Sequence, residues 1–316
     1  SAAQHAETAG VLSTSRELAS RHCRAGESIS AFAPPPSPPI SIEIGPMKFS
    51  SHAALAGALL PAVIEAAQVI LQIRDAGFTV DRKSDDSPVT EADHRAEDIL
   101  SAALRAIHPD IPVVAEESSA SGSAPRIGST FFLLDPLDGT RDYAAGRDDF
   151  SINVGLVDSG QPVFGLIYAP ARRDFFLTLA PGEAMTATVD PASPPHSIAE
   201  LGGRRIGVRE AGPGNLSALL SRSEIGSDFD DRLAALGVTT RTGISSAVKF
   251  GLVARGDADI YPRFGPTCEW DTAAGQAIVE AAGGTMTALD GSPMIYGKAA
   301  SGFLNGSFVA RGRVAV

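Results

Sequence analysis

The chain has 316 residues, of which 44% are hydrophobic and 20% charged, which is typical of a soluble globular protein with room for two domains. Asp and Glu number 37 against 26 Lys and Arg, a formal charge of −11 that argues against a nucleic-acid polymer as partner. The two cysteines, Cys23 and Cys268, match no zinc or disulfide pattern, which favours a reducing, cytoplasmic compartment.

Residues 1–46 are predicted to be a disordered extension outside the folded domains. They are rich in Ala, Ser and Pro, include a proline-rich run at 34–39, and lack hydrophobic periodicity. Such a segment cannot bury enough apolar surface to offset the entropy lost on ordering. The globular pattern begins near Met47, so an upstream extension or a start-site artefact is expected before it.

The most apolar stretch, residues 53–70, is interrupted by Pro61 and Glu65. This pattern predicts a core helix and no integral membrane segment. Nothing near the start has the basic, apolar and small-residue order of a secretion signal. A cytoplasmic protein is therefore expected, with peripheral association with the inner membrane kept as an alternative.

Residues 47–195 are predicted to form an α+β domain. The patterns indicate, in chain order, a helix over 51–76, a strand over 78–81, a polar loop over 83–88, a helix from 90 to before 108, strands over 113–115 and 130–135, a hairpin over 151–168, and a second hairpin turning at 181–182. An antiparallel sheet with helices on one side is the expected first pair of layers.

A proline-rich linker over 190–196 separates this domain from a second, α/β domain over 196–316. There, shorter predicted strands alternate with helices. The strands are expected over 205–208, 239–241 and 259–261, and the helices over 224–236, 247–254 and 271–282.

The most informative segment runs from Phe131 to Thr140. An apolar strand ends at Asp135, a proline enforces a turn, and Asp138 follows with Gly139 and Thr140. The two aspartates can converge where the strand leaves the sheet, as oxygen ligands for Mg²⁺. The backbone amides after them could bind phosphate at a helix start. The alternative is that Asp138 merely caps that helix.

Three further acidic segments support the interpretation of Asp135 and Asp138 as metal ligands. Glu116 and Glu117 end another short strand, although a glutamate pair alone is usually a solvated turn. Asp271 begins a helix of small residues and could be only its N-cap. Asp93 could complete a capping box with Thr90, or accept a proton from Thr140 so that Thr140 orients an attacking water.

Together these motifs resemble the inositol monophosphatase-like superfamily of lithium-sensitive, Mg²⁺-dependent phosphatases. The resemblance covers residues 53–311 and implies a two-domain, layered αβαβα sandwich. Within the superfamily, residues 245–254 and 261–267 are similar to the bacterial CysQ-type 3′(2′),5′-bisphosphate nucleotidases. The resemblance also implies that the protein is a hydrolase that recycles a nucleotide of sulfur metabolism.

The resemblance implies two or three Mg²⁺ ions, with Mn²⁺ as a substitute. The residues it assigns to a first metal are Glu116, Asp135 and the carbonyl of Leu137, and to a second metal Asp135, Asp138 and Asp271. The resemblance also implies that Asp93, Thr140 and Glu116 are catalytic residues. Glu117 receives no ligand role and is expected to be a charge behind the ligands or at the surface.

The implied reaction is removal of the 3′-phosphate of adenosine 3′,5′-bisphosphate, giving AMP and phosphate, with some activity on the sulfated analogue. The residues implied in substrate binding are Leu137, Asp138, Gly139, Thr140, Ser246, Lys249, Arg263 and Asp271. Lys249 and Arg263 suit the phosphate that is not cleaved. The alternatives are a solvated helix residue for Lys249 and a surface salt bridge for Arg263.

Two other functions are weighed against this one. An inositol monophosphatase or fructose-1,6-bisphosphatase would use the same metal ligands. A non-catalytic regulator would be expected to lack a catalytic carboxylate, and all the expected ones are present. The sequence leaves open whether Glu269 tunes the metals or points away, whether Cys268 is open to oxidation, and whether the protein is a monomer or homodimer.

Overall fold

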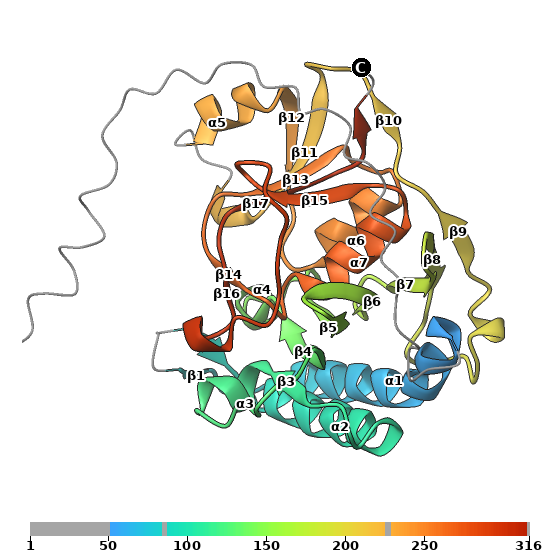
Figure 1. Ribbon diagram of the computed structural model, residues 1–316. Coiled ribbons are helices and arrows are strands. Elements are labelled where there is room, and N and C mark those ends of the chain that lie inside the picture. The colour runs from blue at the N-terminus through green and yellow to red at the C-terminus, as the bar shows by residue number, and fades with distance from the viewer. Residues whose placement is uncertain (1–50, 84–86, 225–228, 315–316) are drawn as a thin grey trace, which may run out of the picture. The chain divides into compact units, whose positions relative to one another are not determined.

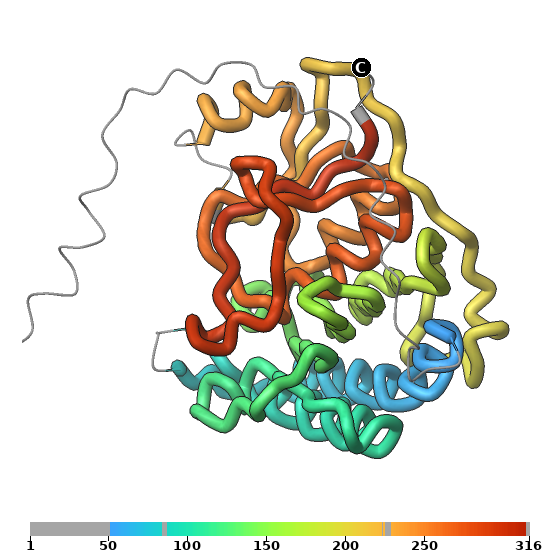
Figure 2. The backbone as a smooth tube through the Cα atoms, in the orientation of Figure 1, coloured from blue at the N-terminus to red at the C-terminus, as the bar shows by residue number. Residues whose placement is uncertain are grey.

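The computed structural model describes residues 51–83, 87–224 and 229–314 (Figures 1 and 2). The predictions for residues 1–46, for the loop residues 84–86 and for 225–228 of the expected helix lie outside these ranges. Residues 48–316 form one compact unit, and the expected domain boundary at residue 195 stays a prediction.

The helices are α1 (His52–Ala76), α2 (Glu91–Ile107), α3 (Glu116–Ala120), α4 (Thr140–Ala144), α5 (Asp230–Ala235), α6 (Val248–Ala254) and α7 (Ala273–Ala281), with 3₁₀ turns at Ala199–Leu201, Arg222–Glu224 and Ala299–Ser301. The longer strands are β3 (Val113–Ala115), β4 (Thr130–Asp138), β5 (Ser151–Asp158), β6 (Gln161–Ala169), β7 (Asp174–Ala180), β8 (Glu183–Thr188), β9 (Arg204–Ile206), β11 (Leu216–Leu220), β12 (Val238–Gly243), β13 (Ile260–Arg263), β15 (Thr285–Ala288) and β17 (Phe308–Arg311). Two-residue strands pair as β1 (Asp81–Arg82) with β2 (Pro88–Val89), β10 (Glu210–Ala211) with β18 (Arg313–Val314), and β14 (Thr267–Cys268) with β16 (Leu304–Asn305).

A seven-stranded sheet, in the order β3-β4-β5-β6-β7-β8-β9, carries most of the core. Its strands are antiparallel neighbours except for the parallel pair β3 and β4. Side chains alternate between its faces. In β4, Phe132 and Leu134 join the cluster with α1 and α2, whereas Phe131 and Leu133 join the cluster with α6 and α7.

The expected first pair of layers, the sheet with α1 and α2 on one side, is confirmed, and α6 and α7 cover the other face. Both faces of the strands are apolar, so both must be covered. A second sheet, β12-β11-β13-β17-β15, packs on the other side of α6 and α7, and α5 lies against its outer face (Figure 1). The layers confirm the αβαβα sandwich.

α1 is long and apolar enough to cross a membrane by length and composition. Its apolar residues, however, are buried in the core with α2 and the seven-stranded sheet. Pro61 lies on its exposed side, and Ser51 caps its start by accepting a hydrogen bond from the Ala54 amide at 3.1 Å. The packing agrees with the prediction of a core helix.

Most predicted elements are confirmed within a few residues. The strand expected over 78–81 is wrong, because the short strand β1 begins only at Asp81. Phe78 instead stacks on Tyr143, with ring centroids 4.8 Å apart. The expected helix over 224–236 is shorter in the described residues, where α5 spans Asp230–Ala235.

Two glycines bring α7 unusually close to the seven-stranded sheet. Gly155 of β5 and Gly165 of β6 are paired across the strands, under the first turn of α7. A Cβ on Gly165 would lie 2.1 Å from the Ala274 carbonyl oxygen, and one on Gly155 would lie 2.8 Å from the Ala273 Cβ. The backbone of α7 therefore rests directly on the sheet, which sets the position of Asp271 just before it.

Substitution Gly165→Ala tests this contact. We expect the added methyl group to displace α7 and lower the free energy of unfolding by about 1–3 kcal/mol. Activity should fall with it because Asp271 moves. Thermal denaturation and phosphatase assays measure both effects. Gly128→Ala is the matched control, since a Cβ there meets no atom within 4 Å. Equal effects of the two substitutions would contradict the packing argument.

Candidate active site and metal centre

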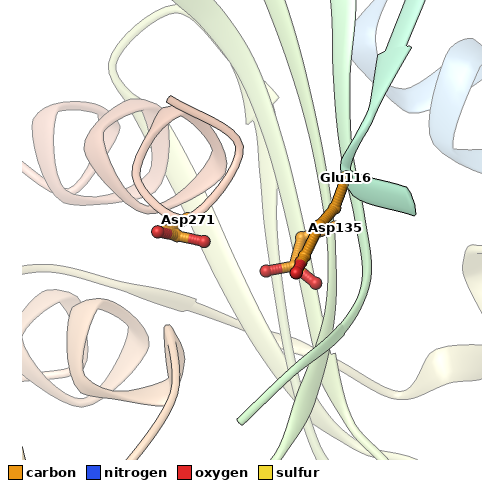
Figure 3. A group of neighbouring side chains, drawn as sticks. All are labelled: Glu116, Asp135 and Asp271. Atoms are coloured by element: carbon orange, nitrogen blue, oxygen red, sulfur yellow. The ribbon is translucent and has the colours of Figure 1, made fainter. Parts of the chain in front are cut away.

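Three carboxylates from separate parts of the chain meet at one point. Glu116 follows β3, Asp135 lies in β4, and Asp271 precedes α7 (Figure 3). Their ligand oxygens all lie within 4.8 Å of one another. The parallel register of β3 and β4 places Ala115 beside Leu134, so the next residues on the two strands, Glu116 and Asp135, are neighbours. Asp271 approaches them from the other layer.

These residues suit divalent cations. Asp135 is 1% exposed, and its Oδ2 is buried with no hydrogen-bond partner among the described residues. Its Oδ1 accepts a hydrogen bond from the Leu137 amide at 3.1 Å. A buried carboxylate oxygen without a partner is costly unless a cation binds it. Carboxylate clusters of this kind are the ligands that Mg²⁺ and Ca²⁺ take in proteins.

The pKa values of Asp135 and Glu116 also favour a cation at this point. Burial, and then the charges of Glu116, Asp138 and Asp271, raise the pKa of Asp135 well above its usual range. Burial raises the pKa of Glu116 to about 8, with Asp271 and Glu117 adding to the rise. Asp135 and Glu116 thus hold their protons more tightly than usual, and a bound cation would favour their charged forms.

Asp138 lies beside this triad and is held from the other half of the chain. Its Oδ2 accepts hydrogen bonds from the Ala247 amide and, at 3.5 Å, from Asn153 Nδ2. Burial and the charge of Asp271 raise its pKa to about 6. The N-cap of α4 is Gly139, so Asp138 does not cap that helix.

Asp271 is not a helix cap either, because the N-cap of α7 is Thr272. Asp271 Oδ2 accepts hydrogen bonds from the Thr267 hydroxyl and from the Cys268 amide, the latter at 2.7 Å. The alternative interpretation of both aspartates as simple caps is therefore wrong, and their carboxylates are available to the site.

Asp93 makes the contacts that both of its expected roles require. Its Oδ2 accepts hydrogen bonds from the Thr90 amide at 2.8 Å and the Thr90 hydroxyl at 2.7 Å, which completes the capping box of α2. Its Oδ1 lies 3.0 Å from Thr140 Oγ1, which can donate to it. The Thr140 hydroxyl is also 3.0 Å from the Leu137 carbonyl.

Two residues missed from the sequence hold the start of α3, where Glu116 lies. Lys83 Nζ donates to Glu116 at 2.5 Å and to Glu117 at 2.6 Å. Burial alone would lower the pKa of Lys83, but the two glutamates outweigh it and raise the pKa. Glu97 accepts hydrogen bonds from the Glu117 amide at 2.7 Å and the Ser118 amide at 2.9 Å. It therefore caps α3, which begins at Glu116.

The signal for Glu97 was present in the sequence. It follows Asp93 by four residues, so both acids lie on one face of α2, and that face is buried. Glu117 is 7% exposed and paired with Lys83, which agrees with a charge behind the ligands and excludes a surface position.

Glu269 is fully buried and binds the backbone of a loop. Its two oxygens accept hydrogen bonds from the Gly297 amide at 2.7 Å and the Lys298 amide at 2.9 Å. These contacts answer the question left by the sequence: Glu269 fixes a neighbouring segment and is not turned to the triad. Cys268 is half-buried and lines the cavity described next.

A cavity of about 890 Å³ opens over the carboxylates. The predicted site residues that line it are Glu116, Asp138, Gly139, Thr140, Ser246, Lys249, Arg263 and Asp271. Asp93, Asp135 and Leu137 are buried and do not belong to its lining within the described residues. Gly139 has a left-handed backbone with φ 95°, and a Cβ there would lie 2.8 Å from the Asp149 carbonyl oxygen.

Lys249 is a buried residue of α6, so the alternative of a solvated position is wrong. It is 2% exposed, and its Nζ donates to the Ser246 carbonyl at 2.7 Å and lies 4.7 Å from the centre of the Tyr261 ring. Burial lowers its pKa to about 8. Ser246 has a left-handed φ of 63°. Arg263 donates to Ser221 Oγ at 2.9 Å, and no carboxylate among the described residues forms a salt bridge with it.

Residues 53–312 match the sequence model of the inositol monophosphatase family. The chain is 37% identical over 246 residues to the 3′(2′),5′-bisphosphate nucleotidase CysQ of Escherichia coli O157:H7, covering 77% of this chain and 94% of that protein. The protein of that name from Salmonella typhimurium is 38% identical with the same coverage.

A solved structure of CysQ from Bacteroides thetaiotaomicron, a bacterial member of the inositol monophosphatase family, is also similar. Its TM-score is 0.66 at 30% identity, and the match covers 83% of this chain and 98% of that chain. An inositol monophosphatase from Zymomonas mobilis, at 24% identity and a TM-score of 0.63, shares the fold. The chain therefore belongs to the inositol monophosphatase family, whose members are metal-dependent phosphatases.

Proposed function

We propose that this chain is a 3′(2′),5′-bisphosphate nucleotidase that removes the 3′-phosphate of adenosine 3′,5′-bisphosphate, giving AMP and phosphate. The observation that carries the proposal is the carboxylate triad within 4.8 Å at one side of an 890 Å³ cavity that also has basic walls. The similarity to proteins named 3′(2′),5′-bisphosphate nucleotidase supports the substrate class. Activity on the sulfated analogue belongs to the same proposal.

We propose two or three Mg²⁺ ions, replaceable by Mn²⁺, as the cofactor. Glu116, Asp135 and the Leu137 carbonyl would hold one ion, and Asp135, Asp138 and Asp271 another. The unpartnered Asp135 Oδ2 and the closeness of Glu116 and Asp271 support this assignment. When bound, the cations supply positive charge that stabilises the phosphoryl oxygens during in-line displacement.

Thr140 and Asp93 are the proposed proton-accepting pair. A hydroxyl has one proton, and the contact of 3.0 Å lets Thr140 direct it to Asp93 Oδ1. The Thr140 oxygen then has lone pairs left for a proton of the attacking water at the cavity wall. Burial raises the pKa of Asp93, which makes its carboxylate a stronger base.

The turn at Gly139 suits a phosphate held close to the backbone. Its left-handed conformation and the lack of room for a Cβ let the Gly139 and Thr140 amides serve the phosphoryl oxygens. Ser246, Lys249 and Arg263 provide the neighbouring wall, in which Lys249 holds the Ser246 carbonyl.

Three proposals of wider scope accompany the activity. We expect a cytoplasmic protein, a monomer or homodimer, and a role in recycling the nucleotide by-product of sulfur metabolism. The solved inositol monophosphatases of Zymomonas mobilis and Anabaena are each 24% identical to this chain, so their likeness supports the shared fold and gives no argument for inositol phosphate as substrate. The presence of every expected carboxylate argues against a non-catalytic regulator.

Asp135→Asn tests the metal assignment. Removing one of several crowded charges should raise the melting temperature of the chelator-treated protein. The same change should abolish the stabilisation that Mg²⁺ gives to the wild type. Differential scanning calorimetry with EDTA and with Mg²⁺ measures both. A variant that is stabilised by Mg²⁺ as strongly as the wild type would contradict the role of Asp135.

Thr140→Ala tests the proton pathway. Without the hydroxyl, kcat should fall by a factor of about 10²–10⁴, while Mg²⁺ affinity changes little. Steady-state kinetics and calorimetric Mg²⁺ titration separate the two quantities. Thr140→Ser is the matched control, because it keeps the hydroxyl that reaches Asp93. A loss confined to metal affinity would refute the proposed role.

A panel of substrates tests the activity itself. Phosphate release should be fastest, by kcat/KM, with adenosine 3′,5′-bisphosphate, and much slower with inositol 1-phosphate and fructose 1,6-bisphosphate. Mg²⁺ should be required for all of them, and Li⁺ should inhibit. Preference for inositol 1-phosphate would overturn the nucleotidase proposal and leave the phosphatase site intact.

A further inference from the structure

A segment between β15 and β17 is joined to the residues around Asp271. We call this segment, residues 295–305, the strap. Its residues that line the cavity are Ala299, Gly302, Phe303 and Leu304. The strap ends in β16, which pairs with β14 (Figure 1). From β14, the Thr267 hydroxyl and the Cys268 amide donate to Asp271 Oδ2. One wall of the cavity and one proposed metal ligand are therefore held by the same pair of strands.

Glu269 holds the strap at two points. Its buried side-chain oxygens accept the hydrogen bonds of the Gly297 and Lys298 amides, and its own amide donates to the Phe303 carbonyl at 2.8 Å. Lys298 Nζ lies 3.1 Å from Glu269 Oε1, so the buried carboxylate has a cation beside it. Because Glu269 is two residues before Asp271, these contacts restrict the backbone that carries the ligand.

Thr272, on the other side of Asp271, is held by the strap as well. Thr272 Oγ1 accepts a hydrogen bond from Asn305 Nδ2 at 2.8 Å and donates to the Glu269 carbonyl at 3.1 Å. Asn305 Oδ1 in turn accepts a hydrogen bond from Lys298 Nζ at 2.6 Å. Thr272 and Asn305 are both buried. A connected set of hydrogen bonds thus joins the strap to the residues on both sides of Asp271.

Asp271 needs such a restraint because it faces like charges. Its ligand oxygen lies within 4.8 Å of oxygens of Glu116 and Asp135. Repulsion between carboxylates at this distance favours movement of Asp271 away from the other two. The hydrogen bonds to Asp271 Oδ2 come from its own neighbours in sequence, so they move with it. The contacts with the strap, which is more distant in sequence, oppose that movement.

We propose that Glu269 is a positioning residue of the metal centre, and that Lys298 and Asn305 complete its network. Glu269 is not a ligand: it acts through the backbone on either side of Asp271, and keeps that carboxylate where one cation can contact it and Asp135 together. The inference rests on the proposed metal assignment. Because the same contacts hold the strap, they also keep one wall of the cavity in place for the substrate.

Calorimetric titration of the full chain with Mg²⁺, in the absence of substrate, tests the role of Glu269. Glu269→Gln keeps the size of the side chain but turns an N–H₂ group toward one of the two backbone amides. The dissociation constant for Mg²⁺ should rise roughly ten- to hundredfold. Since every proposed ligand remains, excess Mg²⁺ should restore most of kcat, whereas KM should stay raised because the strap is displaced.

Lys298→Met separates positioning from simple electrostatics. Removing the negative charge of Glu269 would by itself weaken cation binding, whereas removing the positive charge of Lys298 would by itself strengthen it. Loss of positioning predicts weaker Mg²⁺ binding in both variants, because Lys298 joins Glu269 to Asn305. If Glu269→Gln fails to fold, Lys298→Met carries the test, since that side chain is 34% exposed.

Asp259→Asn is the matched control. Asp259 is also a buried carboxylate, it accepts a hydrogen bond from the Ser217 amide at 2.7 Å, and it pairs with the more exposed Arg209. It is not among the described residues that line the cavity. Its loss should lower the melting temperature, as Glu269→Gln does, and leave the Mg²⁺ dissociation constant at the wild-type value.

Three outcomes would overturn the positioning role. The first is a wild-type Mg²⁺ dissociation constant in folded Glu269→Gln. The second is tighter Mg²⁺ binding in Lys298→Met, which the change of charge alone would explain. The third is an equal loss of affinity in Asp259→Asn, which would indicate a general loosening of the fold. A wild-type protein that does not bind Mg²⁺ would instead overturn the proposed metal assignment, so the two failures can be told apart.

Discussion

Mutual repulsion among closely spaced carboxylates is the constraint on which the rest of the structure depends. Glu116, Asp135 and Asp271 have oxygens within 4.8 Å of one another, and Asp135 has one oxygen with no partner among the described residues. Left without cations, such a group costs stability, and the raised pKa values of Glu116 and Asp135 express that cost. The fold must therefore hold the ligands in place against their own charges.

Each of these acidic residues is held by contacts that the sequence motifs do not predict. Lys83 pairs with Glu116, and Glu97 accepts hydrogen bonds at the start of α3, where Glu116 lies. The Ala247 amide fixes Asp138, and paired glycines beneath α7 bring Asp271 within reach. Because the seven-stranded sheet is covered on both faces, packing restricts movement of β3 and β4, which position Glu116 and Asp135. Packing energy from the core thus maintains a site that is unfavourable in isolation, which is common where function requires preorganised charge.

The sequence predicted the layers, most elements and the acidic residues that meet at the site. Local signals sufficed there: alternation in the strands, turn residues, and aspartates at strand ends. It did not predict that Asp93 acts as cap and acceptor together, nor the contacts of Lys83. These depend on contacts between segments far apart in the chain, and charged side chains have no periodicity that reveals their partners.

The central claim is that cations bind where the three carboxylates meet. A crystal of the protein grown with Mn²⁺ and measured at the manganese absorption edge tests it most directly. The account predicts an anomalous peak within roughly 2.0–2.5 Å of oxygens from Glu116, Asp135 and Asp271. Strong peaks only elsewhere, with the three carboxylates contacting water or Lys83 alone, would contradict it.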